Sequence, residues 1–101
     1  MLIDALGKSY AILVDPLRYV NHPKFSGLLL RRTTEELRDL IRESKQLYKA
    51  AFPKASWSER DKTWTFPSGA QLWFSFLDRD DDALRYQGQA YTWVGFDELT
   101  Q

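Results

Sequence analysis

Two groups of residues, one near each end of the sequence, carry side chains suited to phosphate and metal chemistry. The first is Gly7-Lys8-Ser9, which opens a helical pattern. In a phosphate-binding loop, glycine lets backbone N–H groups approach phosphate, lysine reaches the β- and γ-phosphates, and the hydroxyl ligates Mg²⁺. The complete motif has another glycine five positions earlier, where this chain has Leu2. The first group alone is therefore weak evidence for a nucleotide site.

The second group, Asp97-Glu98, ends an apolar run that begins at Thr92. In nucleotide hydrolases an aspartate at such a place holds Mg²⁺ through water, and a following glutamate orients and deprotonates the attacking water. A doubly wound sheet presents its ligand site at the carboxyl ends of its strands, where both carboxylates would lie. The structural alternative is that Asp97 caps a helix beginning at Leu99.

Together the two groups predict one site, because alternating strands and helices separate them along the chain. In that site Ser9 and Asp97 would hold magnesium and Lys8 would contact the phosphates. Glu98 would act on the attacking water. ATP and Mg²⁺ are therefore the expected cofactors.

The apolar pattern predicts an α/β fold that could position these groups. A helix is expected over residues 7–20, kinked or divided by Pro16. Residues 27–30 form a continuous apolar run, typical of a strand buried on both faces of a parallel sheet. A second helix should begin with the capping-box spacing of Thr33 and Glu36 and end before proline 53.

Later segments predict strands. Three of them alternate polar and apolar residues as half-buried strands do: residues 56–59, 62–66 and 70–77. With a turn at 67–69 they form an antiparallel hairpin. Residues 78–82 read as an acidic turn before a short helix, and residues 92–96 as another buried strand. The expected architecture is one domain, a mainly parallel sheet flanked by helices with the hairpin inserted.

The composition argues against several classes of protein. Fourteen basic and fourteen acidic residues cancel among 101, which argues against a free-standing nucleic-acid binder. The chain has no cysteine, hence no disulfide framework or cysteine metal site. It also shows no signal peptide and no apolar run near the ~18 residues of a membrane span, so a cytoplasmic location is expected. The four tryptophans are expected in the core, and His22 in a loop.

One family shares these patterns. Residues 85–88 (Arg-Tyr-Gln-Gly), followed by residues 91–98, resemble the approach to the Walker B strand in the large terminase subunits of bacteriophages. Three further segments are similar to the same family's first helix and second strand: residues 7–10, 17–19 and 28–33. The similarity covers nearly the whole chain in the right order.

The resemblance implies a P-loop NTPase fold and ATP hydrolysis that drives viral DNA into a procapsid. Lys8 and Ser9 would be Walker A residues, Asp97 the Walker B aspartate and Glu98 the catalytic carboxylate. Implied partners are viral double-stranded DNA, the portal protein, the small terminase subunit and further copies in a ring, with no membrane. The setting would be the host cytoplasm, with the gene in a phage or prophage.

The chain also departs from the family pattern. The first half of Walker A is missing, and the sequence stops three residues past Glu98, before the coupling motif and nuclease carboxylates. We therefore expect a partial ATPase domain that lacks its first strand and C-terminal part, with weak or no activity alone. Alternatives are another P-loop ATPase such as a helicase, and a non-catalytic remnant or interaction domain, which Leu2 favours.

Three arginines have two interpretations: Arg31, Arg32 and Arg85. One of them could sense the γ-phosphate or act on the ATP of a neighbouring subunit. The alternative is that they pair at the surface with the acidic residues 78–82 or with helix carboxylates, as most arginines do.

Overall fold

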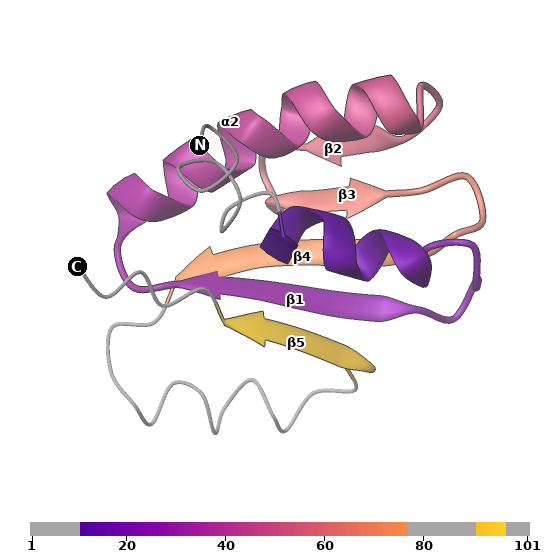
Figure 1. The fold of residues 1–101 in the computed structure, drawn as a ribbon, viewed down its shortest axis with the longest axis horizontal. Helices are drawn as coiled ribbons and strands as arrows, with labels where there is room; N and C mark the ends of the chain where they lie inside the picture. Colours follow the sequence, from indigo (N-terminus) through magenta and orange to yellow (C-terminus); the bar gives the residue numbers. More distant parts are fainter. Residues whose placement is uncertain (1–10, 77–90, 97–101) are drawn as a thin grey trace.

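A computed structural model describes residues 11–76 and 91–96 of this chain as an α/β structure (Figure 1). Residues 11–14 are α-helical and continue into a short 3₁₀ helix. The further elements, in chain order, are η1 (Asp15–Arg18), β1 (Ser26–Arg31), α2 (Thr34–Ala51), β2 (Ser56–Ser58), β3 (Thr63–Thr65), β4 (Gln71–Phe76) and β5 (Trp93–Phe96). The strands form one sheet in the order β2-β3-β4-β1-β5.

The first helical segment changes type at its proline. Pro16 is the second residue of η1, and because proline has no backbone N–H it cannot continue the α-helical hydrogen bonding. The backbone N–H of Tyr19 then donates to the Pro16 carbonyl at 2.9 Å, which closes the 3₁₀ turn. The predicted division at Pro16 is confirmed within the described part of that helix.

β1 is the central parallel strand. It pairs in parallel with β4 on one side and with β5 on the other, so that Leu30 lies opposite both Ser75 and Phe96. Leu28, Leu29 and Leu30 are all buried, which confirms the prediction of a strand covered on both faces. Because all three strands run the same way, their carboxyl ends meet at one edge of the sheet.

α2 begins and ends where the sequence predicts. The Thr33 hydroxyl accepts a hydrogen bond from the backbone N–H of Glu36 at 3.1 Å, which satisfies one of the free N–H groups of the first turn. The helix ends at the C-cap Phe52. Its buried side faces the sheet and the first helical segment: the Tyr48 hydroxyl donates to the Leu13 carbonyl at 2.7 Å. Both helical segments therefore cover the same face of the sheet.

The antiparallel part is larger than predicted. Two hairpins form, since β2 pairs with β3 and β3 pairs with β4, whereas the sequence indicated one inserted hairpin. Gly69, with a φ of 102°, makes the turn between β3 and β4 that other residues adopt only with strain. β4 also pairs with β1 in parallel. The described sheet is thus mixed, with two parallel and two antiparallel pairings, rather than mainly parallel.

β5 differs from the buried strand that its apolar residues predict. Val94 is 48% exposed and Phe96 is 37% exposed, because β5 pairs only with β1 among the described strands. The opposite face is packed: a Cβ atom on Gly95 would collide with the ring of Trp93. Glycine at this position lets the indole lie flat across the strand.

Candidate functional site

The residues predicted to bind nucleotide lie outside the described ranges. This applies to Gly7, Lys8 and Ser9 at one end of the chain and to Asp97 and Glu98 at the other. The acidic segment 78–82 and Arg85 are also outside them. The structure therefore describes the elements that flank the predicted site.

β5 and the start of the first helical segment both point toward the carboxyl edge of the parallel strands. β5 ends there at Phe96, the residue before Asp97. The first helical segment runs from near the middle of the sheet toward the end where β1 begins (Figure 1). At that far end the Trp93 indole N–H donates to the Asp15 carboxylate at 3.2 Å. The start of this helix consequently points toward the edge where the parallel strands end.

Two arginines lie at the same edge: Arg31 is the last residue of β1 and Arg32 comes directly after it. Arg31 is 3% exposed, and its Nη1 donates to the backbone carbonyl of Glu36 at 3.3 Å. Arg31 is therefore buried beside the α2 N-terminus and not at the surface, where the sequence placed it. Arg32 is exposed, and its guanidinium carbon lies 5.4 Å from the centre of the Phe96 ring. This cation–π contact brings a positive charge next to the end of β5.

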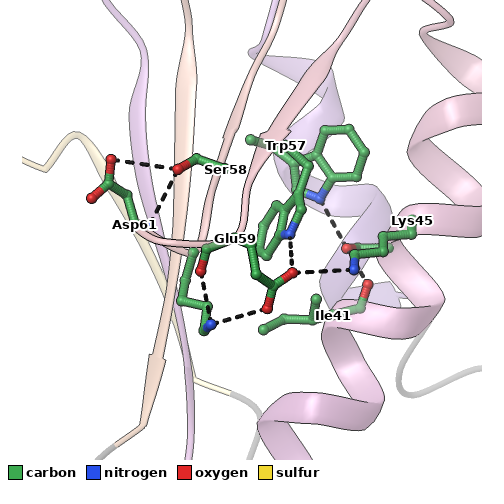
Figure 2. Close-up of polar contacts among 9 residues, drawn as sticks. Ile41, Lys45, Trp57, Ser58, Glu59 and Asp61 are labelled. Carbon is green, nitrogen blue, oxygen red and sulfur yellow. Dashed lines mark hydrogen bonds and ion pairs between the residues drawn. The ribbon is translucent and has the colours of Figure 1, made fainter.

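A cluster of polar side chains that the sequence did not predict is centred on Glu59 (Figure 2). One carboxylate oxygen accepts from the Trp57 indole at 2.9 Å and from Lys45 at 3.3 Å, and the other accepts from Lys62 at 3.0 Å. Hydrogen bonds from Trp57, Lys62 and Lys45 lower the pKa of the Glu59 carboxyl to about 2. The polar run after the alternating strand was a signal for a turn, but nothing local indicated the contact with Lys45 on α2.

The buried hydroxyl of Tyr48 has a structural role. Burial raises the pKa of this phenol well above its usual range, because the charged form would lose its hydration. The ring packs edge-on against Trp64 and Phe66. Of the four tryptophans expected in the core, Trp64 is fully buried, whereas Trp57, Trp73 and Trp93 are only partly buried. His22 lies exposed in the turn region before β1, as expected.

Residues 11–76 and 91–96 contain no group of three or more acidic, histidine or cysteine side chains placed to hold a metal ion. Among the helices in these ranges, none combines the length and the apolar character needed to cross a membrane. The expected magnesium ligands Ser9 and Asp97 are both outside this part of the chain.

Comparison of the chain with family models, with curated proteins and with solved structures gave no match. The resemblance to large terminase subunits therefore rests on the residue patterns given above.

Proposed function

We propose that this chain is part of the ATP-hydrolysing domain of a DNA-packaging motor of the phage terminase type. Gly7, Lys8 and Ser9 would contribute the second half of a Walker A loop. Asp97 and Glu98 would contribute the Walker B carboxylates. This activity is a property of the intact motor, and the chain alone is expected to bind nucleotide more readily than to hydrolyse it.

The observation that carries the proposal is the parallel pairing of β1 with β5, with Leu30 opposite Phe96. Asp97 follows Phe96 directly, and open α/β sheets bind ligands at the carboxyl ends of their parallel strands. The helix that follows Ser9 starts toward this same edge (Figure 1). A helix N-terminus favours phosphate because its N–H groups are free and its dipole is positive there.

Each proposed residue has a separate task. Lys8 would neutralise charge on the β- and γ-phosphates. Ser9 and Asp97 would hold Mg²⁺, which would supply positive charge to stabilise the charge that develops during phosphoryl transfer. Glu98 would accept a proton from the attacking water. Arg32, held beside Phe96, would add positive charge at the phosphate side.

The test is titration of the full chain with Mg·ATP in a calorimeter. Lys8→Ala should weaken binding by at least about tenfold, the loss expected for a charge-assisted hydrogen bond of roughly 1.5–3 kcal/mol. Lys54→Ala is the matched control, because Lys54 is exposed and comes after α2. It should bind as the unaltered chain does.

Hydrolysis is tested separately, on a chain that carries Leu2→Gly and is extended at its N-terminus with a strand. Glu98→Gln should abolish turnover while leaving Mg·ATP binding intact. Unchanged turnover would show the catalytic assignment to be wrong. A folded chain that binds no Mg·ATP would instead leave a non-catalytic domain of this fold.

A further inference from the structure

A groove of about 540 Å³ lies between α2 and β4. Its volume falls within the range of about 300–1,000 Å³ that is typical of ligand pockets. Four apolar side chains line it: Leu37, Ile41, Phe74 and Phe76. Leu37, Ile41 and Phe74 are at most 7% exposed, so they lie deep and form an apolar floor.

Four cations border this floor. Arg38, Arg42 and Lys45 come from α2, and Lys62 comes from the residue before β3. Spacings of four and three residues bring the α2 cations to one side of the helix. Glu59 is the single carboxylate in the lining. The chain as a whole has no net charge, so this groove concentrates positive charge on an otherwise balanced protein.

These cations are available to a partner. Lys45 and Lys62 share Glu59, at 3.3 and 3.0 Å. Arg42 pairs with Asp39 at 2.9 Å, whereas Arg38 makes no ion pair with any residue in the described ranges. All of the paired side chains are more than two-fifths exposed. Exposed ion pairs are weak, so carboxylates of a partner can compete for these cations.

The aromatic residues near the groove favour a peptide over a nucleic acid. Single-stranded nucleic acids bind by stacking bases on open aromatic faces. Trp57 is half-buried, and its ring packs against Trp64 and Phe74 at centroid distances of 5.5 and 5.7 Å. The Lys45 ammonium also lies 5.7 Å from its centroid. The groove thus provides cations and an apolar floor without a stacking platform.

We propose that this groove docks an acidic peptide segment of a partner protein, which inserts an apolar side chain over Ile41 and Phe74. Carboxylates on either side of that apolar residue would pair with Arg38 and Arg42. The apolar side chain would lose its contact with water, which is the main favourable term in most protein association. This docking does not depend on the proposed nucleotide site.

The test uses a fluorescein-labelled peptide, Glu-Asp-Glu-Leu-Phe-Asp-Glu-Asp, and fluorescence anisotropy with the full chain. We expect saturable binding that weakens as salt is added. The double variant Arg38→Glu/Arg42→Glu should bind at least about tenfold more weakly. The matched control is Lys24→Glu/Lys54→Glu, which makes the same charge change at exposed positions outside the groove. Its affinity should fall less than about threefold.

Further variants and ligands separate docking in the groove from unfolding and from general charge attraction. Circular dichroism establishes that the variants remain folded, and Arg38→Gln serves as a milder variant with a partial loss expected. A peptide with Leu and Phe replaced by Ser should bind at least about fivefold more weakly. Equal losses of peptide affinity in the two double variants would mean that the peptide is held by the overall charge of the protein, and would overturn the proposed docking site. Two other results would also overturn it. One is an affinity for a labelled thymidine 12-mer equal to that for the acidic peptide, and the other is no anisotropy change of the labelled peptide at about 1 mM protein.

Discussion

The hydrogen bond between α2 and β3 gives a sharp stability prediction. The Trp64 indole N–H donates to the Ser44 hydroxyl at 2.9 Å, and both residues are fully buried. The Ser44 hydroxyl in turn donates to the Ile41 carbonyl at 2.6 Å. Ser44→Ala would remove the only acceptor that the structure gives to this indole N–H within the described residues.

The expected cost follows from this geometry. A buried donor without a partner costs about 1–3 kcal/mol. The higher helix propensity of alanine offsets about 0.5 kcal/mol of this cost. Loss of the hydroxyl leaves little empty volume. Ser44→Ala should therefore lower the free energy of unfolding by about 1–2 kcal/mol. For a domain of this size that corresponds to a Tm lower by roughly 5–15 °C.

The assay is urea unfolding followed by far-UV circular dichroism, which stays usable when a tryptophan is replaced. Trp64→Phe removes the donor, so Ser44→Ala should cost less in that background, with a coupling energy of at least about 0.5 kcal/mol. Gln46→Ala, at an exposed position of the same helix, should be neutral or slightly stabilising. Equal costs of Ser44→Ala in both backgrounds would show that the Trp64–Ser44 hydrogen bond does not contribute to stability.

Three other changes test separate parts of the structure. Thr33→Ala removes the N-cap of α2 and should cost about 1 kcal/mol in urea unfolding, unlike Thr34→Ala. Gly95→Ala forces the Trp93 ring to move and should cost about 1–3 kcal/mol; an unchanged urea midpoint would contradict this. The folded pKa of Glu59, about 2, lies below its ordinary 4.5, so its contribution is present above pH 4.5 and lost as pH falls toward 2. The free energy of unfolding should consequently fall less steeply between pH 4.5 and 2 in Glu59→Gln than in the unaltered chain. Equal slopes in the two proteins would show that the hydrogen bonds to Glu59 do not stabilise the fold.

Local signals in the sequence predicted local structure well. The Thr33 cap, the change of helix type at Pro16 and the burial of residues 28–30 each depend on a few neighbouring residues. Such features are set by hydrogen-bonding chemistry and apolar pattern within one turn or one strand. They were confirmed because tertiary contacts reinforce them, as where Leu29 and Tyr48 join the same core.

Features that depend on distant pairing could not be predicted. β4 pairs with both β1 and β3. The alternation of polar and apolar residues predicts that a segment is a strand, but it does not predict the strand order, that is, which strands lie next to it in the sheet. The exposure of Val94 and the burial of Arg31 follow from that order as well. The Glu59 cluster depends on Lys45, which lies 14 residues earlier. The predicted nucleotide residues themselves, such as Lys8 and Asp97, remain a prediction.

The central place of β1 has a consequence for how the chain folds. Its neighbour β5 is joined to it across 66 residues, as in the hydrogen bond from the Ser26 N–H to the Thr92 hydroxyl. The β2–β3–β4 meander instead joins near neighbours in the chain. The chain between β1 and β5 forms the longer loop, so closing it costs more conformational entropy than closing the loops of the meander. In pulsed hydrogen exchange during refolding, the amides of β3 and β4 should gain protection first, and those of β5 last.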